Sequence, residues 1–539
     1  MCRSRLLSAT LVAALSFPAL HLSAQQAPAA PIAGRVPLTF PTDDPVIRRI
    51  WSVGMDSSMT EKLAQVLFDS IGPRLTGSPG FASASDWVVS QYKSWGIDAR
   101  RDVYGTWRGW RRGVSHVDLV GPRVRSLEGT MLAWSPGTNG KPVDVDVIGM
   151  PELADSNAAA AWLRTVRGKA VLSTAAQLSC RSSQQWSEFG MEESQARATK
   201  GQDSVTATWD ARLAAFGTVP GALQQKLKEA GALAVLANRW SRYPGIDKIF
   251  GSWRQVLPTY DVGCEDYGLL SRLAEQGQKP RVRLTAESEF LGEKPVFNTI
   301  AEIKGSEKPD EFVLLSAHFD SWDGSSGATD NGTGTIVMME ALRILKAIGF
   351  VPKRTIRVGH WQGEEQGLNG SRAYSEDHPE VVSGLYALFN QDNGTGRVMS
   401  TGPGALPGTA ARLDAWLREM PSALTRWISM TPPGAPANGG SDNASFACYG
   451  APAFGLGALG WDYGLTTWHT NRDTFDKLVR EDLTQNATLV AMLVAQAAND
   501  PNPMPRDRLD PLPLDQRTGQ PQQWPACTKA TRHTIDSPR

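Results

Sequence analysis

The second half of the chain, from Val296 onward, alternates short apolar runs with polar clusters and helical segments. The runs "NTIAEI", "EFVLLSA", "RTIRVGHW", "LYALFN" and "APAFGLGA" predict strands, and residues 335–348 and 483–498 predict largely buried helices. Strands that alternate with helices are typical of a mostly parallel sheet with helices on both faces. We therefore predict an α/β fold, in which ligands bind at the carboxyl ends of the strands.

A polar cluster follows each of these predicted strands. In chain order the clusters contain His318 and Asp320, Asp330, the pair Glu364 and Glu365, Asp392, and His469. Taken alone, an Asp beside Gly is most simply a turn residue or a helix cap, and a lone His is a satisfied polar group. Two adjacent glutamates at a strand end, however, repel each other unless a positive charge compensates them. Imidazole and carboxylate groups on converging loops are zinc ligands, and five such groups suffice for two ions that share one carboxylate.

The first half of the chain has a different character. Two amphipathic helices are expected between residues 57 and 96, and residues 131–287 read as a separate mixed α/β unit. Within that unit the polar stretch "RSSQQWSEFGMEESQARATKGQDS" is expected to be a surface loop. The stretch "GTWRGWRRG" is expected to be a solvated β-hairpin edge, with an anion-binding site as the alternative. The tail after Asp500 is expected to lie over the surface or to be disordered.

Charge and the amino terminus restrict the partners and the compartment. The 539 residues carry 55 Lys and Arg against 55 Asp and Glu, so no net field favours nucleic acid or an anionic membrane. Residues 1–24 combine two arginines, an apolar segment broken by Pro18 and His21, and a small-residue end, which predicts a signal peptide cleaved near Ala24. An uncleaved anchor is the alternative, and Pro18 and His21 disfavour it. We expect an exported protein, periplasmic or extracellular, without stable membrane insertion after cleavage.

Export would leave four cysteines in the mature chain: Cys180, Cys264, Cys448 and Cys527. Their wide separation argues against a cysteine zinc site. An oxidising compartment permits one or two disulfides, and the sequence leaves the three connectivities and the unpaired state open.

The motifs "HFDS", "GATDNGTG", "GEEQGLNGS", "NQDN" and "WHTNRDT" resemble those of a known family in order and spacing. It comprises the dinuclear zinc exopeptidases of the bacterial leucine aminopeptidase, carboxypeptidase Q and glutamate carboxypeptidase type. The resemblance covers about residues 45–130 and 296–500, and the unit between them resembles a protease-associated domain. It implies a mostly parallel mixed sheet flanked by helices, with an inserted smaller α/β domain. The implied segments are signal peptide 1–24, first catalytic part 25–130, insert 131–287, main catalytic part 288–505 and tail 506–539.

The resemblance also implies a role for each polar residue. Asp330 would bridge two zinc ions, with His318 and Asp392 completing one site, Glu365 and His469 completing the other, Glu364 acting as general base and Asp320 orienting the His318 ring. No other cofactor is implied. The chain departs from many relatives in "GGSDNASF", where Asn443 replaces a histidine. This departure leaves the ligand set intact and affects only roles of that loop in shaping the pocket or polarising the substrate carbonyl.

The implied activity is hydrolysis of the terminal peptide bonds of short peptides by a metal-bridging water, as an aminopeptidase or dipeptidase. A carboxypeptidase is the first alternative, and it would need a cation such as Arg372, Arg397 or Arg472 for the terminal carboxylate. A zinc-dependent glutaminyl cyclase and a receptor-like binding protein are further alternatives, although a receptor should have lost ligands. The oligomeric state stays open, including a homodimer. The insert is expected to act as a lid or as a partner-binding surface.

Overall fold

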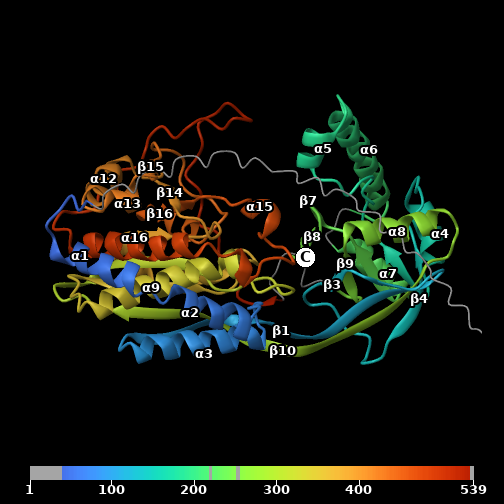
Figure 1. Ribbon diagram of the computed structural model, residues 1–539, viewed down its shortest axis with the longest axis horizontal. Coiled ribbons are helices and arrows are strands. Elements are labelled where there is room, and N and C mark those ends of the chain that lie inside the picture. The colour runs from blue at the N-terminus through green and yellow to red at the C-terminus, as the bar shows by residue number, and fades with distance from the viewer. Residues whose placement is uncertain (1–38, 218–220, 251–254, 535–539) are drawn as a thin grey trace, which may run out of the picture.

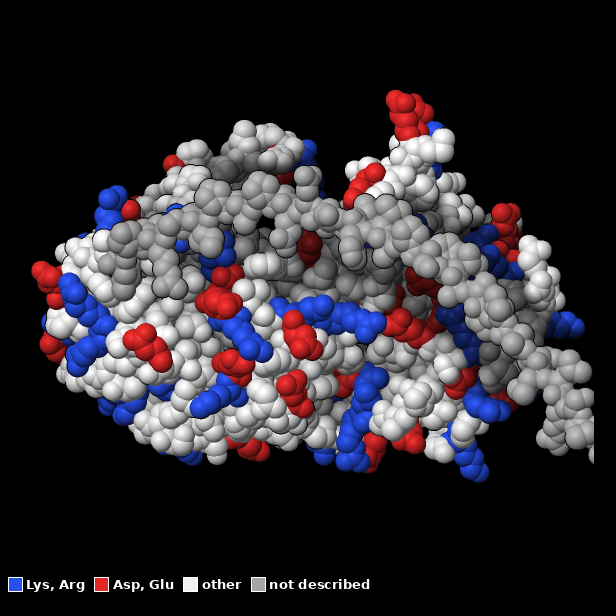
Figure 2. All heavy atoms as spheres, in the orientation of Figure 1, with Lys and Arg blue, Asp and Glu red and all other residues white. Residues whose placement is uncertain are grey.

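The computed structural model describes residues 39–217, 221–250 and 255–534, so the predicted signal peptide lies outside the described residues. Two halves are joined by a pair of long strands along the lower side of the view in Figure 1. Among the helices that the structure describes, we find none with both the length and the apolar character needed to cross a bilayer. Figure 2 shows basic and acidic side chains interspersed over one face, as the balanced composition predicts.

One twelve-stranded mixed sheet runs through both halves. In the second half it contains β10 (Arg281–Ile303), β11 (Lys308–His318), β12 (Arg354–Trp361), β13 (Leu385–Asn390) and β16 (Ala453–Gly455). Strand β11 pairs in parallel with β12 and β13, and β13 pairs in parallel with β16, whereas β10 is antiparallel to β12. The predicted α/β fold with a large, mostly parallel sheet is therefore confirmed.

Helices cover both faces of this part of the sheet, and the alternation of side chains along β11 explains why. Val313 and Leu315 point into the core shared with α9 (Thr333–Ala347) and α16 (Arg480–Asn499). Phe312 and Leu314 point into a second core, under α10 (Asn369–Asp377) and α11 (Pro379–Gly384). A strand buried on both faces reads as a nearly continuous apolar run, as residues 312–317 of β11 do apart from Ser316. The amino-terminal helices α1 (Pro45–Trp51), α2 (Thr60–Gln65) and α3 (Pro79–Ser94) pack into the first core.

The long strands β1 (Asp98–Gly121) and β10 connect the halves as an antiparallel ribbon, paired from Asp98 with Glu302 to Gly121 with Arg281. The stretch "GTWRGWRRG" lies inside β1, so the expected solvated hairpin edge is wrong. Trp107 and Trp110 are 1% and 0% exposed because their face of the ribbon covers a third core. Arg112 on the same strand forms an ion pair with Asp323.

The other half is built on parallel strands β4 (Val143–Ile148), β5 (Lys169–Leu172), β6 (Ala234–Ala237) and β9 (Thr259–Val262), with α4 (Ser156–Leu163), α7 (Ala222–Glu229) and α8 (Cys264–Glu275) around them. The polar stretch expected as a loop instead forms α5 (Ser183–Phe189) and α6 (Ser194–Ala214), which project from this half in Figure 1. Neither helix buries a residue, so neither has an apolar stripe from which sequence could recognise it. The capping box of Ser182 and Gln185 marks where α5 begins.

The structure contains two disulfides, Cys180 with Cys264 and Cys448 with Cys527. The second disulfide fastens the tail, whose Arg532 carbonyl accepts a hydrogen bond from the Thr106 N–H at 2.8 Å. The described part of the tail therefore lies over the surface. The remaining elements are β2 (Arg125–Leu127), β3 (Gly129–Met131), β7 (Trp240–Tyr243), β8 (Ile246–Asp247), β14 (Val398–Thr401), α12 (Ala410–Arg418), α13 (Ser422–Thr425), β15 (Ser429–Met430), α14 (Ala444–Ala447), β17 (Gly457–Ala458) and α15 (Tyr463–Thr466).

Candidate metal centre

The polar clusters predicted from sequence meet at the carboxyl edge of the sheet. His318 is the last residue of β11, Glu364 and Glu365 follow the end of β12, Asp392 follows β13, Asp330 precedes α9, and His469 follows α15. The parallel strands end at this edge, so their following loops converge there. The side chains of His318 and Asp330 are 1% and 5% exposed, so the centre is largely shielded from water.

Asp330 lies between the two histidines. Its Oδ1 is 3.3 Å from His318 Nε2, and its Oδ2 is 3.2 Å from His469 Nε2. Each histidine has a second carboxylate nearby: Asp392 Oδ1 is 3.2 Å from His318 Nε2, and Glu365 Oε2 is 2.8 Å from His469 Nε2. The five side chains thus form two His-carboxylate groups with one shared aspartate.

The donor set fits divalent cations. Ligand atoms of His318, Asp330 and Glu365 all lie within 4.8 Å of one another. Asp330 Oδ2 and Glu365 Oε1 are buried without a hydrogen-bond partner among the described residues. Unpaired carboxylate oxygens at this depth are costly unless a cation approaches them. Imidazole with carboxylate is a donor set that zinc accepts.

Electrostatics describe the same excess of negative charge. Burial raises the pKa of Glu364 well above its usual value, and the neighbouring carboxylate of Asp392 adds to the shift. Burial and the charge of Asp330 do the same to the pKa of Glu365. Burial lowers the pKa of His318, but the carboxylates of Asp392 and Glu364 outweigh it and leave that pKa well above its usual value. Only added positive charge relieves such crowding without protonation.

The expected contact between Asp320 and His318 takes a different form. The His318 Nδ1–H donates to the main-chain carbonyl of Asp320 at 3.0 Å, whereas the Asp320 carboxylate is 3.8 Å from that nitrogen. The carboxylate instead accepts the Thr76 hydroxyl at 3.1 Å and the Glu364 N–H at 3.2 Å. Residue 320 therefore acts twice: its carbonyl fixes the tautomer that leaves Nε2 facing the centre, and its carboxylate holds the Glu364 loop.

Three buried charged residues around the centre were missed from sequence. Asp473 accepts the N–H groups of Thr329 and Asp330 at 2.7 and 3.0 Å, which fixes the loop carrying the shared aspartate. Asp442, 0% exposed, has its pKa raised to about 7 mainly by burial. Both lie in motifs that sequence singled out, "WHTNRDT" and "GGSDNASF", but nothing in the pattern distinguishes a buried Asp from a turn Asp.

The third missed residue is Arg74, which is fully buried beside the centre. Its guanidinium donates to the main-chain carbonyls of Phe319, Gly72, Ser326 and Gly327 at 2.7 to 3.1 Å. Burial lowers its pKa to about 10, opposed by the charges of Asp473, Asp320 and Asp330. Arg74 thus joins the amino-terminal loop to both sides of the "DSWDGSSGATD" loop. The signal was the stretch "IGPRLTGSPG", without an indication that its arginine is buried.

Comparison with known proteins supports this fold. Residues 298–494 match the model of peptidase family M28. Carboxypeptidase Q of Rattus norvegicus is 28% identical over 330 residues, 61% of this chain and 63% of that protein. Carboxypeptidase Q of Xenopus laevis is 30% identical over 341 residues, 62% of this chain and 65% of that protein. The matches thus span less than two thirds of either relative.

Solved structures support the fold. The crystal structure of a peptidase M28 precursor from Shewanella amazonensis aligns with a TM-score of 0.62 at 24% identity, covering 87% of this chain and 98% of that one. The match to the peptidase family model, together with the imidazole and carboxylate groups at the carboxyl edge of the sheet, indicates the class of zinc metallopeptidases. Residues 298–494, the stretch that matches the model of peptidase family M28, contain His318, Asp330, Glu365, Asp392 and His469.

Proposed function

We propose that this protein is an exported zinc-dependent exopeptidase that hydrolyses terminal peptide bonds of short peptides. The observation that carries the proposal is the position of Asp330, with one oxygen 3.3 Å from His318 Nε2 and the other 3.2 Å from His469 Nε2. This is the arrangement that a carboxylate shared by two ions requires. Asp392 then completes the first site and Glu365 the second. When bound, two zinc ions would polarise the substrate carbonyl and lower the pKa of a water molecule between them.

Glu364 is the proposed general base. It is adjacent in sequence to the ligand Glu365, and its N–H is held by the Asp320 carboxylate at 3.2 Å, so its position relative to the centre is fixed. Burial raises its pKa, and a carboxylate with a raised pKa is a stronger base for taking a proton from water. Glu364 would take the proton from the attacking water and give it to the leaving amine. Asp320 is a positioning residue.

Support for the substrate class comes from the relatives, which are named carboxypeptidase Q. We propose an aminopeptidase or a dipeptidase, with a carboxypeptidase as the second candidate. All five ligand-type residues are present, which disfavours a receptor-like binding protein, and a glutaminyl cyclase would cyclise amino-terminal glutamine instead of cutting peptides.

We also propose that residues 131–287 are an inserted domain of the protease-associated type that limits access to the centre. Two residues of this insert contact the segment that carries His469. The Ser241 hydroxyl donates a hydrogen bond to the Leu465 carbonyl, and the Ile249 N–H donates to the His469 carbonyl. A unit placed there would exclude long chains and admit short ones. Deletion of the insert should then broaden the accepted peptide length; an unchanged length preference would contradict this role.

The test of activity is mass spectrometry of short peptides with free, amino-blocked and carboxyl-blocked ends, incubated with the zinc-loaded protein. Stepwise loss from free amino termini would indicate an aminopeptidase, and loss from carboxyl termini or from dipeptides alone would indicate the other branches. Glu364→Gln should retain zinc and lose about 10²–10⁴-fold in kcat. Glu419→Gln, at an exposed glutamate directly after α12, is the matched control. Substantial turnover by Glu364→Gln would reject the assigned base, and no cleavage of any peptide by the wild type would reject the function.

A further inference from the structure

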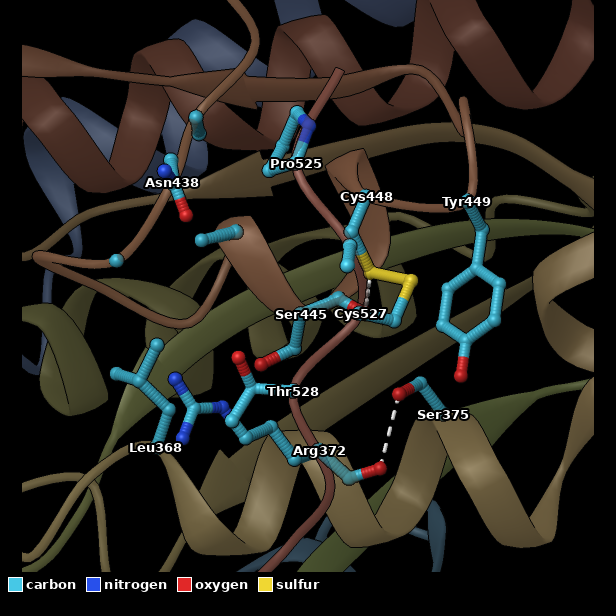
Figure 3. Close-up of a pocket in the computed structure, with 14 residues that line it drawn as sticks. Leu368, Arg372, Ser375, Asn438, Ser445, Cys448, Tyr449, Pro525, Cys527 and Thr528 are labelled. Carbon is cyan, nitrogen blue, oxygen red and sulfur yellow. Dashed lines mark hydrogen bonds between the residues drawn. A yellow bond between two sulfur atoms is a disulfide. The ribbon is translucent and has the colours of Figure 1, made fainter. Parts of the chain in front are cut away.

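A pocket next to the candidate centre contains a cation that the proposed chemistry does not use. The pocket is small, about 20 Å³, and lies between α10, α14 and the tail segment fastened by the Cys448–Cys527 disulfide. Figure 3 shows Arg372 reaching from α10 into this pocket, with its guanidinium between Leu368 and Thr528.

The pocket is connected directly to the catalytic loop. The N–H of Leu368, on its wall, donates to the main-chain carbonyl of Glu364 at 2.9 Å. Leu368 is the N-cap of α10, and the Arg372 N–H in the first turn donates to the Leu368 carbonyl at 3.0 Å. Ser371 Oγ lies 2.8 Å from Ser445 Oγ, which ties α10 to α14 and holds the two walls together. A peptide at the centre that extends toward α10 would therefore meet the Arg372 side chain.

Arg372 differs from the other two arginines considered for a terminal carboxylate. Arg397 Nη1 donates to Asp482 Oδ1 at 3.3 Å, and its guanidinium also lies over the Trp427 ring. Arg472 forms an ion pair with Glu128 and donates to the Gly245 carbonyl. The guanidinium of Arg372 has no hydrogen bond or ion pair with any residue in the described part of the chain.

The surroundings of Arg372 keep this cation available. Burial lowers the pKa of its guanidinium, while the carboxylates of Asp442, Glu364 and Glu376 oppose the shift. Glu376 is itself paired with Arg532 at 3.0 Å, and Asp442 is fully buried. An arginine of this kind, half-buried and unpaired, has five N–H donors in a fork that matches a carboxylate.

We infer that Arg372 binds a carboxylate of the peptide substrate, either its terminal carboxylate or an acidic side chain, and so determines specificity at the proposed centre. This inference rests on the proposed function for its biological meaning. The binding itself does not depend on turnover. A terminal carboxylate at Arg372 would point to the carboxypeptidase or dipeptidase candidate, whereas an acidic side chain there is compatible with an aminopeptidase as well.

The experiment measures binding to the zinc-loaded Glu364→Gln protein by calorimetry, with three matched peptides. Alanyl-glutamine has only a terminal carboxylate, alanyl-glutamate α-amide has only a side-chain carboxylate, and alanyl-glutamine amide has neither. Each is titrated with Arg372 intact and with Arg372→Met, which keeps the apolar stem. Arg123→Met, at an exposed arginine in the turn after β1, is the control. Arg372→Lys tests whether charge without the guanidinium fork suffices, and thermal unfolding shows whether each variant is folded.

We expect Arg372→Met to weaken one of the two carboxylate peptides by about 10- to 100-fold and the amide without a carboxylate by less than about twofold. A loss for alanyl-glutamine identifies the terminal carboxylate, and a loss for alanyl-glutamate α-amide identifies an acidic side chain. Equal losses for all three peptides, unchanged affinities, or no preference of the parent protein for a carboxylate would overturn the inference. Because this readout needs no cleavage, it separates failure of the inference from failure of the proposed peptidase activity.

Discussion

The N–H of Ile249 donates a hydrogen bond to the main-chain carbonyl of His469 at 2.8 Å, so a residue far away in sequence supports a candidate metal ligand. The contact continues on both sides. Asp247 and Asn471 are joined by two hydrogen bonds of 3.0 Å, and Lys248 forms a β-bridge with Thr470. His469 itself has φ 55°, a left-handed conformation that a non-glycine residue keeps only when its surroundings hold it there.

The first prediction concerns Lys248, whose Nζ donates to the carbonyls of Gly464 and Trp468 at 2.7 and 2.5 Å. Its ammonium group also lies 4.5 Å from the centre of the Trp468 ring, which stacks on the His469 ring. Lys248→Met should loosen this loop and weaken zinc binding at the His469 site by several-fold to about tenfold. Competition with a chromogenic chelator measures that affinity.

Lys228→Met, at an exposed lysine of α7, is the matched control for Lys248→Met and should leave both zinc affinities unchanged. If Lys248→Met behaves like the control, the contacts of Lys248 with the His469 loop do not support zinc binding. If both zinc affinities fall and the thermal stability falls as well, the variant disturbs the fold as a whole.

The second prediction uses zinc stoichiometry to test the shared aspartate. Asp330→Ala removes a ligand from both proposed sites, so it should reduce bound zinc from about two per chain toward zero, whereas His469→Ala should leave about one. Elemental analysis after gel filtration gives the count. Asp462→Asn is the control, because Asp462 is exposed and directly precedes α15, which leads to His469. This variant should bind as much zinc as the wild type. One zinc in the wild type, or one retained by Asp330→Ala, would contradict a bridging role.

The third prediction addresses Asp473, whose carboxylate accepts the N–H groups of Thr329 and Asp330 at 2.7 and 3.0 Å. An Asn at this position has one acceptor oxygen, and its amide would face one of the two N–H groups. Asp473→Asn should therefore displace the Asp330 loop and weaken zinc binding by about 10- to 100-fold, as for other residues that hold ligands in place. Asp473→Glu keeps two acceptor oxygens, so its zinc affinity should lie between those of the wild type and of Asp473→Asn. Wild-type affinity in Asp473→Asn would show that the loop holds itself.

Sequence could predict the strands, the large helices and the five ligand-type residues because each has a local sequence pattern. These patterns are the apolar runs, their spacing and the polar residue after each strand. The partners of those residues are set by tertiary structure. Arg74 and Asp473 bond main-chain groups of distant loops, and no pattern marks such contacts. Helix α6 was missed because it has no apolar face, and the burial of Trp107 depends on its pairing register with β10. The disulfide pairs likewise required distances between distant segments.

The last prediction concerns His360, which is fully buried in β12 and receives no charged partner. Its Nε2 lies 2.8 Å from the Tyr92 hydroxyl, and burial lowers its pKa to about 3. In the unfolded chain a histidine titrates near 6.5. Between about pH 6.5 and pH 3, His360 is therefore protonated in the unfolded chain and neutral in the folded protein. The stability from neutral His360 is fully present above pH of about 6.5 and is lost as pH falls toward 3.

From this one group the free energy of unfolding should fall by about 1.4 kcal/mol for each pH unit within that window. His360→Gln cannot be protonated and keeps an acceptor for the Tyr92 hydroxyl, so its stability should fall less steeply by that amount. Denaturant unfolding of the chelator-treated proteins between pH 7.5 and 4.5 measures the slopes without a contribution from metal release. His116→Gln, at an exposed histidine of β1, should follow the wild-type slope. Parallel slopes for wild type and His360→Gln would mean that the folded protein opens at His360 before it reaches the unfolding transition.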